Sequence, residues 1–355
     1  MLENKCGLLK FVPWPAPTPS GAPVTISGMR TKATINFAEP GITPTTDPAD
    51  IGTVTLYSVS NTEKWAILLP QDTVKNATVS YPTSGDPNFS QTVTVPAIRA
   101  NCFYGGFNGI PVGLEYVDLG LPNGTLWAAC NVGSCTPEGY GTFFAWADTK
   151  PRTAYCWSHY PYAQDPDPSD GDTMHWEFPD NGANLWLTKY NTQDTWLPEG
   201  YETPDGITTL ESDDDAAVAN MGNDWRTPTV DEWQELIDGT TPSLDTVNGI
   251  GGIRFTATNG KSIFLPFAGF YSGPQHAGYY NSDRLPMGEY WSNEIDEENP
   301  YQAKCLYIDD PTYGNPDPEG SLEHISVTSW DPSALSPTGF IRNEGRPVRA
   351  VYDPR

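Results

Sequence analysis

The sequence predicts a two-domain protein, an all-β sandwich followed by an α+β domain, and three observations support this. The chain has 355 residues, enough for two hydrophobic cores of ordinary size. Its 33 Gly, 35 Pro and 12% aromatic residues are typical of strands that are joined by turns and anchored by aromatic side chains. Strand-like segments occur along the whole chain, whereas helical patterns occur only in its second half.

The first domain is expected over residues 24–111. Its segments are rich in β-branched residues, and several alternate apolar and polar side chains, which is typical of half-buried strands. They are "VTISGMRTKATINF", "GTVTLYSV", "KWAILLPQDTV", "ATVSYP" and "QTVTVPAI". No helical period competes with them, so we expect a sandwich. Residues 1–23 are expected to be a leader or an irregular segment, and the Gly-rich "YGGFNGIPVG" marks the boundary near residue 112.

The second domain is expected over residues 112–355, with two helices among strands and long loops. The first helix is "SDDDAAVANM", with Ser212 or Asp213 as its N-cap. The second begins at Thr229, because Thr229 and Glu232 have the spacing of a capping box, and Gly239 is expected to end it. The strands expected after it are "IRFTA", "SIFLP", "YWSN", "AKCLYID", "HISVTSW" and "GRPVRAVY".

Charge excludes two classes of partner. The formal net charge is −26, which repels nucleic acid and anionic membrane surfaces. No apolar run reaches the length of a membrane span, so direct membrane insertion is not expected. The opening "MLENKCGLLKFVPWPAP" lacks the pattern of a secretory signal peptide. A cytoplasmic protein and a chain without its leader therefore both stay open.

The cysteines do not identify the compartment from spacing alone. They are Cys6, Cys102, Cys130, Cys135, Cys156 and Cys305, and none forms a CxxC pair. Cys130 and Cys135 are close enough in sequence to bridge across a turn. Buried thiols are the alternative, and the sequence does not decide between the two.

Seven phrases in the second half resemble a known family. They are "EYVDLGLPNGTLWA", "GTFFAWADT", "LTKYNT", "DDAAVANMGNDWRTPTVDEWQEL", "GKSIFLPFAGF", "YWSN" and "GRPVRAV". In this order, over residues 114–352, they resemble the C-type-lectin-like domains of gut-bacterial surface proteins, which are distantly similar to the formylglycine-generating enzyme. The resemblance implies that Asp224, Trp225 and Arg226 are buried, with Arg226 paired to a carboxylate.

The first half resembles the fimbrillins, pilins of the same bacteria with a transthyretin-like sandwich. "VTISGMRTKATINF" followed by "WAILLPQDTV" is similar to the later strands of a fimbrillin N-terminal domain. The match covers about ninety residues and lacks the earlier strands, so the sandwich is expected to be incomplete. The resemblance implies partnership with other pilin subunits by addition of a β-strand.

Enzymatic chemistry is not expected. The oxidase relatives of the second domain use a pair of late cysteines, whereas the last cysteine here is Cys305. His159, His175, His276 and His324 lack the spacing of a zinc site, and no GxSxG elbow or P-loop is present. We therefore predict no catalytic residues and no required cofactor.

Calcium is the one metal that the sequence brings into question. "DPDPSDGD" places Asp165, Asp167, Asp170 and Asp172 in one segment, and residues 309–320 are similarly acidic. Neither segment has the ligand pattern of an EF-hand, and solvated acidic loops are the alternative. A specific calcium site stays open, and its ligands are unknown.

Ligand binding is expected on a face built by residues 275–301, the loop 309–320 and the turn near Arg342. Aromatic faces with flanking amides and charges suit sugars. The candidate ligand-binding residues are Tyr279, Tyr280, Asn281, Asp283, Arg284, Asn293, Glu294, Asp296, Tyr301, Arg342 and Asn343. Their exposed members are expected to tolerate alanine, whereas Trp225→Ala or Trp233→Ala is expected to cost roughly 3 to 5 kcal/mol.

The sequence thus predicts a non-enzymatic surface adhesin, with a pilus-tip subunit as its most specific form. Its partner would be a host or bacterial surface glycan or protein, and its location the cell surface or a fimbrium after export. The alternative is a receptor-binding protein of a phage virion or of a retroelement-diversified system with the same head. A formylglycine-generating-like oxidase is the third hypothesis.

Overall fold

The computed structural model divides the chain into two compact units, Met1–Leu114 and Glu115–Arg355. The expected boundary near residue 112 lies two residues from this division. The structure describes residues 7–11, 22–31, 33–36, 41–44, 50–58, 64–69, 75–95, 102–104, 112–165, 185–198, 200–273, 275–277, 287–310, 325–328 and 340–353.

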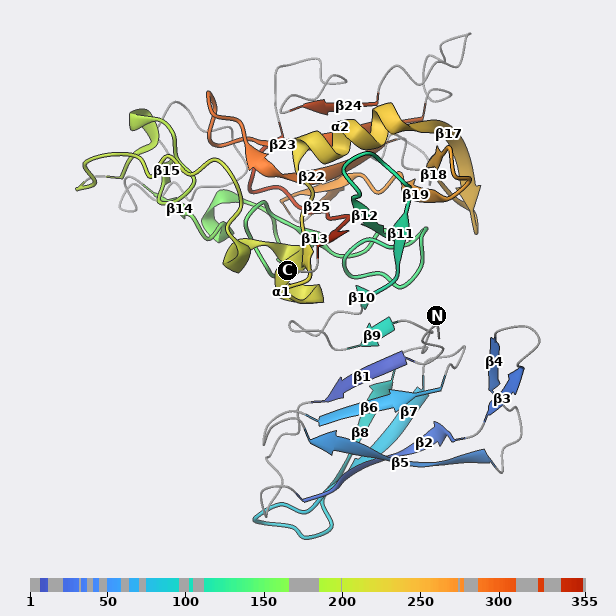
Figure 1. Ribbon diagram of the computed structural model, residues 1–355. Coiled ribbons are helices and arrows are strands. Elements are labelled where there is room, and N and C mark those ends of the chain that lie inside the picture. The colour runs from blue at the N-terminus through green and yellow to red at the C-terminus, as the bar shows by residue number, and fades with distance from the viewer. Residues whose placement is uncertain are drawn as a thin grey trace. The chain divides into compact units, whose positions relative to one another are not determined.

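The first unit consists of strands in its described part. Eight of them form one hydrogen-bonded order, β10-β9-β1-β6-β5-β2-β7-β8, and β3 pairs with β4 (Figure 1). They are β1 Gly7–Phe11, β2 Val24–Arg30, β3 Ala33–Asn36, β4 Gly41–Pro44, β5 Ile51–Ser58, β6 Lys64–Leu68, β7 Lys75–Ser80, β8 Ser90–Val95, β9 Cys102–Tyr104 and β10 Val112–Gly113. The expectation of an irregular segment over residues 1–23 is wrong for β1, which pairs with β6 along its whole length.

Alternating apolar residues explain why these segments are strands. Along β2, Val24 and Ile26 are buried while the residues beside them are partly exposed, and β7 repeats the pattern with Ala77 and Val79. β5 joins the two halves of the order, since its first part pairs with β2 and its end pairs with β6. The buried faces of β2 and β7 therefore contribute to the core of the first unit.

In its described residues, the second unit contains two α-helices among short sheets. The helices are α1 Ala216–Met221 and α2 Val230–Gly239. Three 3-10 turns occupy Trp157–His159, Asp194–Trp196 and Ser212–Asp214. The strands are β11 Tyr116–Asp118, β12 Leu126–Ala128, β13 Phe143–Phe144, β14 Ala163–Gln164, β15 Trp186–Leu187, β16 Trp225–Arg226, β17 Thr240–Val247, β18 Ile250–Ala257, β19 Ser262–Pro266, β20 Phe270–Ser272, β21 Gln275–Ala277, β22 Met287–Ile295, β23 Ala303–Asp309, β24 Ser326–Thr328, β25 Arg346–Pro347 and β26 Val351–Tyr352.

The sheets of the second unit are small and antiparallel. Their strand orders are β11-β12-β26-β16, β17-β18-β19, β22-β23-β24, β13-β25, β14-β15 and β20-β21. The molecule is thus mostly β, and the two expected helices are present. Among the described residues, no helix is long and apolar enough to cross a membrane.

Helix α2 lies along β22 and β23 and supplies the centre of the larger core (Figure 1). Its Trp233 and Leu236 are wholly buried in a cluster that includes Trp127, Phe255 and Leu306. The rings of Trp127 and Trp233 are 4.6 Å apart, and the Trp233 indole nitrogen donates to the carbonyl of Trp291 at 3.3 Å. A second cluster of buried residues contains Trp157, Tyr160 and Trp196.

The predicted capping box of α2 is confirmed. The Glu232 amide donates to the Thr229 hydroxyl at 3.1 Å, and the Thr229 amide donates to the Glu232 carboxylate at 2.9 Å. Gly239 does not have the left-handed C-cap conformation that its position suggested; it is the last helical residue. A Cβ there would lie 2.5 Å from a methyl of Leu121, so close packing requires glycine.

The N-cap expected for α1 is wrong by two or three positions. Asp215 caps the helix and accepts from the amide of Ala217 at 2.8 Å, while Ser212 and Asp213 begin the preceding 3-10 turn. Asp215 also accepts from the amide and hydroxyl of Thr227 at 2.8 and 2.7 Å. This carboxylate therefore joins α1 to the segment that leads into α2.

The segment Asp224–Arg226 was expected to be buried, and this holds for Trp225 but not for Asp224. Trp225 is buried, whereas Asp224 is exposed. Arg226 forms the expected ion pair, with Glu232 at 2.7 Å, and also contacts Asp353 at 3.0 Å. The opening of α2 is consequently tied to β16 and to the end of β26.

Candidate functional site

The candidate site lies at the end of β22 and on the turn that joins it to β23, because four expected ligand-binding residues occur there. Asp296 closes this turn, since its Oδ1 accepts from the amides of Glu298 and Asn299 at 2.9 and 3.0 Å. The Asp296 amide donates to the carbonyl of Gln302 at 3.1 Å. Asp296 therefore shapes the turn while staying partly exposed.

A second loop packs beside this turn. The Thr192 hydroxyl and the Gln193 side-chain amide both donate to the carbonyl of Glu297, at 2.6 and 3.1 Å. The rings of Trp196 and Tyr301 are 5.1 Å apart. Residues 192–196 and 296–301, far apart in sequence, therefore form one surface, which we call the turn surface.

Asn293 and Glu294 lie in the last part of β22, just before this turn, against a different segment. The Leu210 amide donates to the carbonyl of Asn293 at 2.8 Å, and Glu294 forms an ion pair with Lys304 at 3.1 Å. Asn293 Oδ1 is buried and lacks a hydrogen-bond partner among the described residues. The structure thus places Asn293 and Glu294 at the end of β22, and Asp296 and Tyr301 on the turn that follows it.

Arg342 and Asn343 do not belong to an exposed face. Arg342 is 0% exposed and Asn343 4%. The Arg342 guanidinium donates to the hydroxyl of Tyr160 at 2.9 Å and to the carbonyls of Tyr190 and Pro300 at 2.8 and 2.7 Å. The expectation that this turn is exposed is therefore wrong. The Arg342 guanidinium is buried because it donates its hydrogen bonds to carbonyl and hydroxyl oxygens inside the domain.

Two further arginines follow Arg342 in the same buried segment. Arg346 pairs with Glu289 at 2.6 Å and lies over the ring of Trp291, with its guanidinium carbon 4.6 Å from the ring centroid. Arg349 donates to Asn131 Oδ1 at 2.8 Å and to the carbonyl of Phe264 at 2.9 Å. Burial lowers the pKa of Arg349. These cations hold core segments together and are not available to a ligand.

The remaining expected ligand residues and most of the calcium candidates lie outside the described residues. This applies to Tyr279, Tyr280, Asn281, Asp283 and Arg284, to Asp167, Asp170 and Asp172, and to residues 311–320. Within the part of the chain that the structure describes, no group of three or more His, Cys, Asp or Glu side chains could hold a metal ion.

Sequence reasoning missed a polar cluster centred on Asp214. Its carboxylate accepts from Lys189 at 2.6 Å, from the Tyr190 hydroxyl at 2.7 Å and from the Tyr162 hydroxyl. Burial favours a higher pKa for Asp214, but the hydrogen bonds from Lys189, Tyr162 and Tyr190 outweigh it and lower the pKa. Burial favours a lower pKa for Lys189, but its bonds to Asp214 and Glu211 raise it. Both groups are therefore held in their charged forms.

Acidic side chains surround the turn surface. Asp194, Glu297 and Glu298 on its two loops are exposed, and so is Asp205, whose carboxylate accepts from the amides of Tyr190 and Asn191. The nearby cations Lys189 and Lys304 are both paired with carboxylates. The surface is consequently negative, which suits neutral or cationic ligands better than anions.

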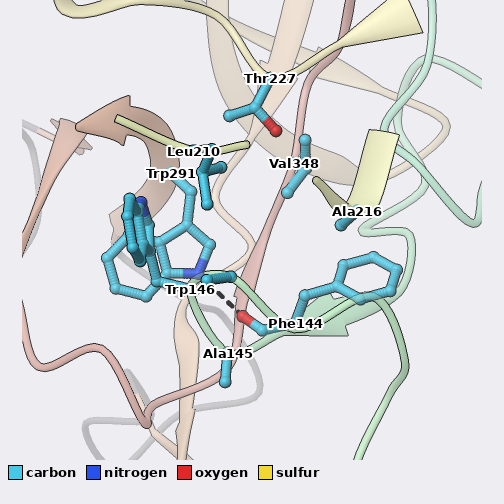
Figure 2. A pocket seen from close by; sticks show the side chains of 9 residues that line it. Phe144, Ala145, Trp146, Leu210, Ala216, Thr227, Trp291 and Val348 are labelled. Carbon is cyan, nitrogen blue, oxygen red and sulfur yellow. Dashed lines mark hydrogen bonds between the residues drawn. The ribbon is translucent and has the colours of Figure 1, made fainter. Parts of the chain in front are cut away.

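A small cavity lies elsewhere in the second unit (Figure 2). Phe144, Ala145, Trp146, Ala147, Leu210, Ala216, Thr227, Trp291 and Val348 line it. The Trp291 indole nitrogen beside it donates to the carbonyl of Phe144 at 2.8 Å. Its volume of about 10 Å³ is the space of a single water molecule, so it is a packing gap and not a ligand site.

Three cysteines of the second unit are buried thiols, Cys130, Cys156 and Cys305. Cys102 and Cys135 are in the disulfide form. The expected possibility that Cys130 bridges to Cys135 is therefore wrong.

The turn surface offers the groups of a binding site. They are one partly exposed aromatic ring, exposed carboxylates and side-chain amides. Comparison with protein-family models gave no match, and comparisons with curated proteins and with solved structures gave none either.

Proposed function

We propose that this chain is a non-enzymatic adhesin of the bacterial cell surface. In this proposal a fimbrillin-like β-sandwich carries a C-type-lectin-like domain that binds ligand. The observation that carries it is the division into a unit of strands and a second unit whose loops meet at the turn surface. Loops positioned by a rigid scaffold are common sites of binding.

The chemistry of the turn surface favours a neutral or amino sugar as ligand. Tyr301 offers part of an aromatic face, Gln193 has a side-chain amide on the neighbouring loop, and Asn299 is exposed on the turn itself. Glu297 and Glu298 add negative charge. Sialylated or sulfated glycans would be repelled by these carboxylates, so we expect them to bind poorly.

The first unit supports the pilus-tip form of the proposal. Strands β8 and β10 stand at the two ends of its strand order. A strand at the end of a sheet presents backbone N–H and C=O groups that a strand from a neighbouring subunit can pair with. A tip subunit accepts such a strand and carries the binding domain outward.

The state of two cysteines supports an exported location. Cys102 and Cys135 are in the disulfide form, and disulfides persist in oxidising compartments outside the cytoplasm. The cell surface or a fimbrium fits this better than the cytoplasm.

The test is a glycan-array and cell-binding screen of the full chain, in calcium and in a chelator. We expect binding to neutral or amino sugars. Tyr280→Ala, within the expected ligand face, and Glu298→Ala, on the turn surface, should weaken binding with an unchanged melting temperature. Tyr116→Ala is the matched control, since Tyr116 is exposed on β11.

Two results would overturn the proposal. One is the absence of binding to any glycan or cell surface, and the other is full binding by both Tyr280→Ala and Glu298→Ala. A thiol-oxidation assay with added copper should show no turnover. Turnover there would support the oxidase hypothesis instead.

A further inference from the structure

Cys156, Ser158 and His159 come together at one 3-10 turn, away from any role in the turn surface. The turn spans Trp157–His159, and Cys156 precedes it in an extended conformation. The His159 amide donates to the Cys156 carbonyl at 3.0 Å, which folds His159 back toward the cysteine. The Cys156 sulfur lies 2.8 Å from Nδ1 of His159 and 3.2 Å from the Ser158 hydroxyl.

The surroundings of this sulfur differ from those of the buried thiol Cys305. Cys156 is 4% exposed, but the two side chains within hydrogen-bond distance of its sulfur, Ser158 and His159, are exposed. Cys305, at 0% exposed, lies within β23 between its pairing partners Trp291 and Thr328. Exposed side chains change rotamer in picoseconds to nanoseconds, so the Cys156 sulfur can be uncovered without unfolding, whereas Cys305 cannot.

A thiol beside an imidazole nitrogen has the arrangement of a nucleophile and its base. Nδ1 of His159 can accept the thiol proton, and the thiolate is the form that attacks disulfides. We propose that Cys156, assisted by His159, is a site of thiol–disulfide exchange with small disulfides. This inference does not depend on the proposed adhesin function.

The exchange is balanced without any further reagent. His159 takes the proton from Cys156, and the thiolate attacks one sulfur of the small disulfide. A new S–S bond forms between Cys156 and that sulfur while the original S–S bond breaks. The departing thiolate takes the proton back from His159 and leaves as a thiol. Cys156 is oxidised and the small disulfide is reduced.

The test uses the full chain and oxidised glutathione as the small disulfide. Each cysteine is followed by peptide mass spectrometry, with iodoacetamide as a second probe. Cys156 should acquire glutathione and should react with both probes at least about tenfold faster than Cys305, which serves as an internal control.

Two substitutions separate base assistance from simple packing. His159→Asn keeps a hydrogen-bonding group near the sulfur but cannot take up a proton, and it should slow Cys156 about tenfold. Ser158→Ala should leave the rate within about twofold of the parent. Melting temperatures are measured alongside to verify that both variants are folded.

Three results would overturn the inference. They are a Cys156 that reacts no faster than Cys305, a folded His159→Asn variant that keeps the parent rate, and a slowed rate in Ser158→Ala equal to that in His159→Asn. Glutathione found on Cys156 together with a slowed His159→Asn variant supports it.

Discussion

Arg226 and Glu232 form a two-point ion pair in which both donor–acceptor distances are 2.7 Å. The same Glu232 carboxylate closes the capping box of α2 through the amide of Thr229. One side chain thus begins the helix and binds the strand that precedes it. The planar fork of arginine is the group that matches a carboxylate in this way.

The first prediction concerns this pair. Glu232→Ala should lower the free energy of unfolding by about 3 kcal/mol, because it leaves a partly buried guanidinium without its main partner and removes half of the capping box. Urea denaturation followed by tryptophan fluorescence measures the change. Asp231→Asn is the control, since Asp231 is exposed in the same helical turn and should cost under about 1 kcal/mol. Equal losses in the two variants would show that the pair has no special role.

The second prediction is the dependence of stability on acid. Burial favours a higher pKa for Glu232, but the bonds from Arg226 and Thr229 outweigh it and lower the pKa below its ordinary 4.5. A carboxyl whose pKa is lower in the folded state stabilises above its unfolded pKa and loses that contribution as the pH falls through the folded one. Stability should therefore fall below about pH 4.5, and Glu232→Gln should flatten this fall.

Asp215 should affect the pH dependence of stability in the opposite direction to Glu232. Burial raises its pKa despite its hydrogen bonds from Thr227 and Ala217. Its ionisation therefore opposes folding, and protonation from its raised pKa down to the ordinary value of 3.8 stabilises the fold. Asp215→Asn should steepen the acid loss. If the free energy of unfolding falls equally steeply below pH 4.5 in the parent and in Glu232→Gln, then Glu232 is not a source of the acid sensitivity.

The third prediction concerns Arg342. Arg342→Lys should cost about 3 kcal/mol, because an ammonium cannot reach the hydroxyl and carbonyl oxygens that the guanidinium joins. Arg254→Lys is the control, since the Arg254 and Asp245 side chains that pair at 2.6 Å are 33% and 36% exposed, and the change there should cost under about 1 kcal/mol. An Arg342→Lys variant that is as stable as the control would place the side chain at the surface after all.

The fourth prediction concerns Gly345, the glycine of the "GRPVRAV" phrase. A Cβ on Gly345 would lie 2.7 Å from the ring of Tyr155. Gly345→Ala should therefore cost about 1 to 3 kcal/mol through overpacking. Gly85→Ala is the matched control, since a Cβ at Gly85 meets no atom within 4 Å. Thermal unfolding compares the two variants, and equal melting temperatures would contradict the clash.

Local signals in the sequence predicted the helix that begins at Thr229 and the strand of residues 303–309, because capping and apolar periodicity act over a few residues. The burial of the Arg342 side chain was not predicted, because a charge is normally exposed and its partners are the Tyr160 hydroxyl and carbonyls far away in the sequence. The apolar residues Phe340 and Ile341 directly before it were the available signal. Likewise, Asp296 was expected to bind a ligand. Its carboxylate instead accepts from the backbone amides of Glu298 and Asn299, in a turn that residue type alone does not specify.

Two of the buried arginines, Arg342 and Arg349, affect the stage of synthesis at which the second unit can fold. Arg342 reaches the carbonyls of residues 189, 190 and 300, and Arg349 reaches those of residues 128, 129 and 264. During synthesis these earlier segments emerge from the ribosome long before residues 340–352 do. The second unit must therefore wait, with its apolar surfaces incompletely covered, for its final strands. The strand pairings of the first unit all lie within Met1–Leu114, so that unit can fold first. The second unit should therefore depend on chaperones during synthesis more than the first unit does.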